Sequence, residues 1–212
     1  MTDSPARPLS ARLTAIIAEG VAGWADLPIL AGIRSGTLDP ALFRNYLEQD
    51  YLYLRAYARH YSRLAATSTD DETLEYFVAL AHGVVAVELE HHKQAALPFG
   101  CDFSDVRPSP ETAEYLAFYD GFADDFDGML VAMLPCIYGY GVALESLRGA
   151  AEGAYREWVD IYTGGDYAAL VDRHLRLVDD ARLPEHRALE ITDRALELER
   201  RFWNQLPETV EA

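Results

Sequence analysis

The chain has 212 residues, of which 50% are hydrophobic and 25% charged, a composition typical of one soluble globular domain. Its 35 acidic and 18 basic residues give a formal net charge of -17, and a field of that sign repels phosphate backbones and anionic lipids. We therefore expect neither nucleic-acid binding nor membrane docking. Two cysteines make no disulfide scaffold, and neither a signal segment nor a membrane-length apolar run occurs, so we expect a cytoplasmic protein with reduced thiols.

Helical periodicity predicts the elements of the first half of the chain, and no convincing alternating strand occurs. A first helix is predicted at residues 10–23, where apolar side chains recur on one side. Residues 25–39 are interpreted as a connector, because proline and glycine interrupt the pattern there. A long tyrosine-rich helix follows at 39–67. Residues 68–72 carry the hydroxyl and acidic side chains that cap a third helix, which is expected to reach residue 97.

The second half continues with further helices after a loop at residues 98–109. The acidic cluster at 124–127 marks the start of the fifth helix, because acidic side chains are favourable at a helix N-terminus. The five helices predicted in this half lie at residues 110–122, 124–149, 154–162, 166–180 and 184–205. We therefore predict an all-α, single-domain bundle of about eight helices at residues 10–206, with flexible ends at 1–9 and 207–212 and with sites between facing helices.

An acidic residue lies on the aromatic face of the long tyrosine-rich helix. Spacings of three and four residues put one set of side chains on a continuous face: Phe43, Tyr46, Asp50, Tyr53, Tyr57 and Tyr61. A buried carboxylate needs hydrogen-bonding partners, because leaving it without them is costly. Asp50 is therefore either a structural acceptor for a tyrosine hydroxyl or an arginine, or a group that binds a ligand.

Cys136 and Glu199 are the other candidate functional residues. Cys136 lies in the apolar run LPCIYGY, one helical turn before Tyr140. Its thiol is either an inert small hydrophobe or a nucleophile activated from another helix, since no lysine or arginine lies within one turn. Glu199 borders the apolar stripe of the last helix, three residues before Phe202. It is either a rim residue or, where burial raises its pKa, a general acid.

An acid–histidine cluster near the end of the third predicted helix is a candidate for metal binding. It consists of Glu88, Glu90, His91 and His92. Di-iron sites in helical bundles draw such residues from several helices. The candidate partner segment around His174 lacks a second ligand one turn later. We therefore expect a satisfied or exposed histidine pair and no metal site.

Several segments taken together resemble the TenA (thiaminase II) family, whose members are all-α enzymes with a haem-oxygenase-like fold. The matching segments are FRNYLEQDYLYLRAY at residues 43–57, Leu134-Pro135-Cys136 with Tyr140, Tyr155-x-x-Trp158-x-x-x-Tyr162, and Glu199-x-x-Phe202-Trp203. Each segment is a weak signal alone, but the set in this order is fairly specific. The resemblance covers about residues 10–205.

The resemblance implies hydrolysis at the exocyclic methylene of a 4-aminopyrimidine. The implied substrate is 4-amino-5-aminomethyl-2-methylpyrimidine or thiamin, and the product is the hydroxymethylpyrimidine that re-enters thiamin synthesis. It implies a cysteine adduct, with Cys136 as the nucleophile and Glu199 as the general acid and base. The implied reaction needs no metal or organic cofactor, and the family's homotetramer is expected by resemblance. Which of the two substrates is preferred stays open.

The resemblance also implies a set of substrate-binding residues. Asp50 corresponds to the acid that binds the amidine-like edge of the ring. The other implied residues are Tyr53 and Tyr162, which orient the glutamate and the substrate, Tyr140 near the thiol, and Tyr115 with Phe202, which sandwich the pyrimidine. Tyr119 is the substitute for Tyr115, because the segment between Tyr115 and Cys136 is shorter here than in the family.

Two other functions remain open on the sequence. One is a metal-dependent or redox enzyme of the same fold, similar to the pyrroloquinoline-quinone synthesis proteins (PqqC-like) or the di-iron oxygenases. The incomplete histidine set counts against it. The other is a non-catalytic protein that sequesters a pyrimidine or regulates transcription, although the acidic charge opposes direct contact with DNA.

Overall fold

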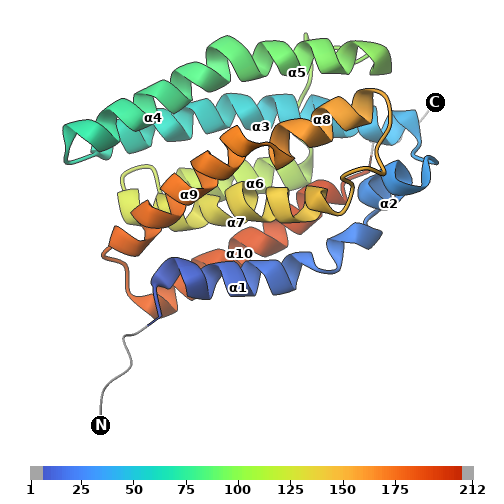
Figure 1. Cartoon of the computed structure of the whole chain (residues 1–212). Helices are drawn as coiled ribbons and strands as arrows, with labels where there is room; N and C mark the ends of the chain where they lie inside the picture. Colours follow the sequence, from blue (N-terminus) through green and yellow to red (C-terminus); the bar gives the residue numbers. More distant parts are fainter. Residues whose placement is uncertain (1–6, 207–212) are drawn as a thin grey trace.

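The computed structural model describes residues 7–206, which form α-helices and short helical turns and, within that range, no strand (Figure 1). The predicted all-α bundle is confirmed. The ends at residues 1–6 and 207–212, expected to be flexible, lie outside the described residues. Leu9, which was assigned to the flexible N-terminus, is instead the first residue of helix α1 (Leu9–Val21).

The connector expected at residues 25–39 is a wrong prediction, because most of it is helical. A 3-10 turn, η1 (Trp24–Asp26), is followed by the α-helix α2 (Pro28–Ser35). Proline suits the first position of a helix, where its missing amide hydrogen has no partner to lose. Gly36 ends α2 with a left-handed φ of 69°, which glycine adopts without steric cost. The proline and glycine that indicated a connector therefore mark the two ends of a short helix.

The tyrosine-rich helix forms as predicted, as α3 (Pro40–Thr67), with the Asp39 side chain accepting from the amide of Ala41 at its start. The third predicted helix is interrupted. It consists of α4 (Asp71–Gly83), a π-helical turn η2 (Val84–Glu88) and α5 (Leu89–Ala96), and the 3-10 turn η3 (Leu97–Phe99) follows. A π-helical turn holds one residue more than an α-helical turn and occurs frequently at functional sites.

The remaining helices lie close to their predicted positions. They are α6 (Pro110–Asp120), α7 (Phe126–Glu145), α8 (Ala154–Thr163), α9 (Gly165–Asp180) and α10 (Glu185–Trp203). Figure 1 shows α4 and α5 over α3 on one side of the bundle, with α1 and α10 on the opposite side and α7 between them. The described chain therefore has ten α-helices where the sequence predicted about eight, because α2 was missed and the third helix is divided.

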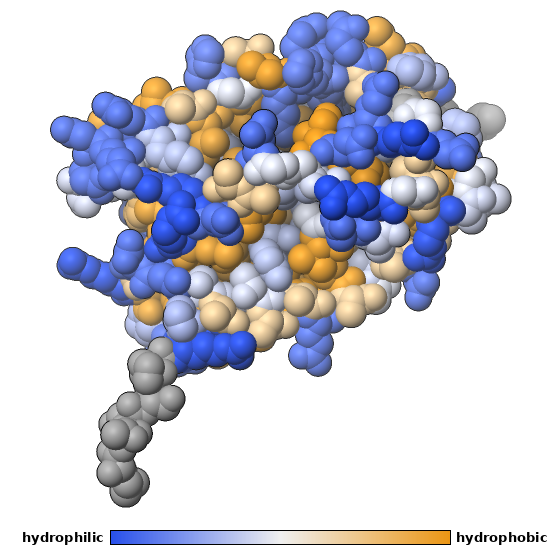
Figure 2. Space-filling view, viewed as in Figure 1, coloured by the Kyte–Doolittle hydropathy of each residue, from blue (hydrophilic) through white to orange (hydrophobic). Residues whose placement is uncertain are grey.

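Helix α7 is the central apolar helix of the bundle. Its length and composition would let it cross a membrane, but 72% of its apolar window is buried inside the structure. That degree of burial is what a core helix of a soluble protein shows. Figure 2 shows that hydrophilic side chains cover much of the visible face of the molecule, with apolar side chains exposed between them.

Candidate active site

A cavity of about 490 Å³ lies between α3, the segment from α4 to α5, and helices α7 to α10. This volume falls in the range that accommodates a small heterocyclic ligand. Val87 and Ile161 line the cavity and are also exposed, so its mouth lies beside them. Of the described residues that line it, none is a lysine or an arginine, whereas four are acids: Asp50, Glu88, Asp166 and Glu199.

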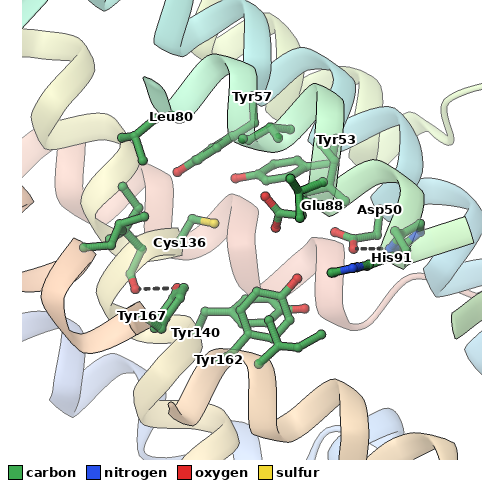
Figure 3. A pocket seen from close by; sticks show the side chains of 18 of the residues that line it. Asp50, Tyr53, Tyr57, Leu80, Glu88, His91, Cys136, Tyr140, Tyr162 and Tyr167 are labelled. Atoms are coloured by element: carbon green, nitrogen blue, oxygen red, sulfur yellow. Dashed lines mark hydrogen bonds and ion pairs between the residues drawn. The ribbon is translucent and has the colours of Figure 1, made fainter. Parts of the chain in front are cut away.

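The tyrosine face of α3 forms one wall of the cavity. Asp50, Tyr53, Tyr57 and Tyr61 all line it from a single helix, and Figure 3 shows Asp50, Tyr53 and Tyr57 pointing toward the cavity. Arg55, on another side of α3, is exposed. The predicted continuous aromatic face of this helix is confirmed.

Asp50 is only 5% exposed, and its Oδ2 has no hydrogen-bond partner among the described residues. This oxygen faces Nδ1 of His92 at 3.5 Å. The other ring nitrogen of His92, Nε2, lies 2.8 Å from the carbonyl oxygen of Leu47. A carbonyl oxygen can only accept, so Nε2 carries a hydrogen, and a neutral His92 turns the lone pair of Nδ1 toward Asp50.

Burial determines where the proton of this pair resides. Burial raises the pKa of Asp50 to about 7. Burial also lowers the pKa of His92, against the opposing effect of its hydrogen bond to Leu47. Both shifts favour the proton on the carboxyl group near neutral pH. No tyrosine hydroxyl or arginine of the described chain donates to Asp50. The interpretation of Asp50 as a structural hydrogen-bond acceptor therefore lacks the partner that it requires.

Glu199 lies near the end of α10, is 2% exposed, and is held by two donors. The Tyr115 hydroxyl donates to its Oε2 at 2.6 Å, and Nε1 of Trp203 donates to its Oε1 at 2.9 Å. Tyr119 donates to the Tyr115 hydroxyl at 2.9 Å, and the hydroxyls of Tyr53 and Tyr119 are 2.8 Å apart. Three tyrosines thus connect the cavity wall to this carboxyl group.

The pKa of Glu199 is suited to proton transfer at neutral pH. Burial raises it to about 7, although the hydrogen bonds from Tyr115 and Trp203 act in the opposite direction. A carboxyl group with such a pKa is present in both its protonated and its ionised form near pH 7. It can therefore give up or accept a proton there, which is the property of a general acid or base.

The position of Tyr115 corrects an expectation from the family resemblance. Tyr115 and its substitute Tyr119 were expected to stack on a substrate ring. Both are 0% exposed, and neither is among the residues that line the cavity. Their rings stack on each other with centroids 4.9 Å apart, because their hydroxyls are committed to the connection with Glu199. Phe202, the other expected ring, does line the cavity, with its centroid 5.2 Å from that of Tyr53.

Cys136 lies on α7 and presents its thiol to the cavity (Figure 3). Burial raises the pKa of this thiol well above its ordinary value, and the negative charge of Glu199 acts in the same direction. The hydroxyls of Tyr53 and Tyr57 act in the opposite direction. The thiol is therefore protonated at rest, and it needs a base before it can act as a nucleophile.

Tyr140 and Tyr162 meet at the wall opposite α3. Their ring centroids are 4.5 Å apart, and the Tyr140 hydroxyl is hydrogen bonded to that of Tyr46 on α3. Tyr167 lies beside them and donates to the carbonyl oxygen of Ile137 at 2.7 Å (Figure 3). Sequence reasoning missed Tyr167 as a lining residue, and no local pattern marks it.

The acid–histidine cluster does not assemble with its candidate partner. Glu88, His91 and His92 line the cavity, whereas Nε2 of His174 lies 2.7 Å from the carbonyl oxygen of Leu130 in another part of the bundle. Across residues 7–206, no three candidate ligand side chains lie close enough together to hold a metal ion. Glu88 was considered on the sequence only as a metal ligand, so its place in the cavity wall was missed.

Two proteins that are named for pyrimidine compounds are similar in sequence to this chain. An aminopyrimidine aminohydrolase of Halalkalibacterium halodurans is 28% identical over 162 residues, which cover 72% of each chain. The kinase THI20 of Saccharomyces cerevisiae, named for hydroxymethylpyrimidine and phosphomethylpyrimidine, is 27% identical over 186 residues. That match covers 81% of this chain but only 34% of the yeast protein.

A solved structure has a fold similar to that of this chain. The crystal structure of a TenA family transcription regulator from Silicibacter sp. TM1040 has a TM-score of 0.82 and 25% identity, and the match covers 94% of this chain and 96% of that one. The model of the TENA/THI-4/PQQC family matches residues 28–208, which is most of the sequence. The chain therefore belongs to the TENA/THI-4/PQQC family.

Proposed function

We propose that the protein is an aminopyrimidine aminohydrolase, which replaces the amine of 4-amino-5-aminomethyl-2-methylpyrimidine with a hydroxyl group. The observation that carries the proposal is that Asp50, Cys136 and Glu199 line one aromatic cavity from three different helices. The similarity to the aminohydrolase of H. halodurans supports the same reaction. We place the enzyme in the cytoplasm and assign it to thiamin salvage. The homotetramer remains a prediction.

Asp50 is suited to bind the amino edge of the pyrimidine. That edge presents an amino hydrogen as donor and the neighbouring ring nitrogen as acceptor. A protonated carboxyl group offers the complementary pair, because its hydroxyl donates and its carbonyl oxygen accepts. The raised pKa of Asp50, about 7, keeps this form populated near neutral pH. Phe202 and the tyrosines of the cavity wall provide faces on which the ring can stack.

The first half of the reaction forms a bond between Cys136 and the ring. The thiol sulfur adds to the unsubstituted ring carbon, and the thiol proton passes through Glu199 to the ring nitrogen beside that carbon. The ring amino group then donates its lone pair, and a double bond forms to the exocyclic methylene. The substrate amine is protonated at neutral pH, so when its bond to this methylene breaks, the electron pair leaves with it as neutral ammonia. Covalent catalysis thus divides one difficult displacement into easier steps.

The second half restores the enzyme. Water adds to the exocyclic methylene and releases a proton, which the ammonia takes up, and the ring amino group is regenerated. The carbon–sulfur bond then breaks, and the ring nitrogen returns its proton to sulfur through Glu199. The net reaction exchanges one amine for one hydroxyl group and leaves Cys136 and Glu199 unchanged.

The proposal is tested by incubating the purified protein with the aminomethylpyrimidine and, in parallel, with thiamin. We expect the hydroxymethylpyrimidine and ammonia to form in equal amounts from the first substrate. Pyrimidine binding without any product would contradict the proposal and favour the sequestering alternative. Turnover only after addition of a metal ion would favour the metal-dependent alternative.

A further inference from the structure

Glu88 is an acid in the cavity wall to which the proposed reaction assigns no step. It is the last residue of the π-helical turn η2, and its carboxyl group projects into the cavity (Figure 3). Burial and the nearby Asp50 raise its pKa to about 7, against the effect of a hydrogen bond from Tyr162. A carboxyl group in this setting has no cationic side chain to neutralise it, because the described lining contains no lysine or arginine.

The cavity as a whole is suited to a cationic ligand group. His91 and His92 are its basic side chains, and His92 is already committed to Leu47 and Asp50. Asp166, the fourth acid, is exposed and belongs to the outer part of the cavity. The tyrosine rings add faces that attract a cation. A positively charged group would therefore be drawn inward to Glu88.

The order of groups around the substrate ring indicates which part of it meets Glu88. The aminomethyl substituent is attached to the ring carbon that lies between the amino-bearing carbon and the unsubstituted carbon. In the proposed reaction Asp50 binds the amino edge and Cys136 attacks the unsubstituted carbon. In the view of Figure 3 the carboxyl group of Glu88 lies between Asp50 and Cys136, and Asp50 is close enough to raise its pKa. The aminomethyl group of a bound substrate therefore points to the side of the ring that Glu88 occupies.

We propose that Glu88 accepts a hydrogen bond from the ammonium group of the substrate and thereby selects an amine as the leaving group. This inference rests on the proposed function and names the specificity of the same cavity. A primary amine is protonated at neutral pH and offers N–H donors to a carboxylate. The thiazolium ring of thiamin is also cationic, but its nitrogen carries no hydrogen. Charge-assisted hydrogen bonds are about twice as strong as neutral ones, so Glu88 favours the aminomethylpyrimidine over thiamin.

Glu88 would also discriminate between the substrate and its product. The product carries a neutral hydroxymethyl group in place of the ammonium group, at almost the same size. Loss of the charge weakens the interaction with Glu88, so the product leaves more readily than the substrate. The position of Glu88 thus couples substrate preference to product release.

The test compares binding of the aminomethyl- and hydroxymethylpyrimidines, measured by titration calorimetry at about pH 8, where an ordinary primary amine is still charged. The Cys136→Ser protein serves as the background, so that no turnover disturbs the measurement. We expect it to bind the aminomethyl ligand more tightly. Adding Glu88→Gln should reduce this preference by about 10- to 100-fold while leaving hydroxymethyl binding unchanged.

Glu90→Gln is the matched control, because Glu90 is exposed on the following helix and its carboxylate accepts only from Gln94 among the described residues. It should leave the preference intact. An unchanged preference in Glu88→Gln, or equal weakening of both ligands, would overturn the inference. The ratio of the two ligand affinities tests the role of Glu88 without any turnover. Failure of the proposed function would appear instead as absence of product from the wild-type protein, so the two failures are distinguishable.

Discussion

The Tyr115 hydroxyl lies 2.6 Å from Oε2 of Glu199, and it is the last member of a hydrogen-bonded row that begins at Tyr53 on the cavity wall. This donor stabilises the ionised form of Glu199, while burial favours the neutral form. The balance leaves the pKa of Glu199 at about 7. The pKa of Glu199, the proposed general acid and base, is thus adjusted by Tyr115, a residue that does not line the cavity.

Replacing Tyr115 with phenylalanine tests this relationship. The loss of one donor to the charged carboxylate raises the pKa of Glu199, by about one to two pH units if the hydrogen bond is of ordinary strength. The ionised form of Glu199 accepts the thiol proton, so the rising limb of kcat/KM against pH should move to higher pH by the same amount. Tyr76→Phe is the control, because the Tyr76 hydroxyl has no hydrogen-bond partner within the described chain. A profile that does not move in Tyr115→Phe would contradict the account.

Asp50→Asn and Asp50→Ala distinguish a protonated carboxyl group from an ionised one. An asparagine offers one donor and one acceptor, as a protonated carboxyl group does, whereas alanine offers neither. We expect Asp50→Asn to retain a KM near that of the wild type below pH 7 and to lose the rise in KM above it. Asp50→Ala should raise KM at every pH. Equal loss of substrate binding in both variants would show that the charge of Asp50, and not its proton, binds the ring.

The stability of the protein should fall as pH rises through neutrality. Asp50, Glu88 and Glu199 have folded-state pKa values raised to about 7, whereas unfolded carboxyl groups titrate near pH 4. The folded state therefore binds more protons between these values, and its stabilisation is fully present below pH 4 and lost as pH rises through 7. The proposed substrate binding and chemistry use these groups, which explains why they are retained at a cost in stability.

Glu199→Gln tests the predicted pH dependence of stability. Glutamine removes the cost of ionising a buried carboxyl group, so the free energy of unfolding at pH 8 should rise by about 1 to 3 kcal/mol. Below about pH 4 the variant and the wild type should differ little, since the wild-type carboxyl group is then mostly neutral in both the folded and the unfolded state. Urea unfolding at the two pH values is the measurement. A variant that is less stable than the wild type at pH 8 would contradict the raised pKa of Glu199.

Much of the fold followed from periodicity, and the exceptions have local causes. The face of α3 was predictable because the spacing of Asp50, Tyr53 and Tyr57 is the period of a helix, whatever packs against it. The division of the third helix at η2 was not, because no proline interrupts the sequence there. The missed α2 shows that proline and glycine indicate where an element ends without stating what lies between them.

The sequence allowed the main residues of the candidate site to be predicted, but it did not allow the positions of all their neighbours to be predicted. Asp50, Cys136 and Glu199 were singled out from the sequence, and all three line the cavity. The burial of Tyr115 behind Glu199 depends on how α6 packs against α10, which no local pattern records. The position of Glu88 likewise depends on the π-helical turn, which rotates the residues around it relative to a regular helix.

The most direct measurement is amine release from 4-amino-5-aminomethyl-2-methylpyrimidine by the wild-type protein and two cysteine variants. Cys136→Ser should lose nearly all turnover while its circular dichroism spectrum stays unchanged. Cys101→Ser should retain it, because Cys101 does not line the cavity. Near-normal turnover by Cys136→Ser would contradict the cysteine adduct at the centre of the account.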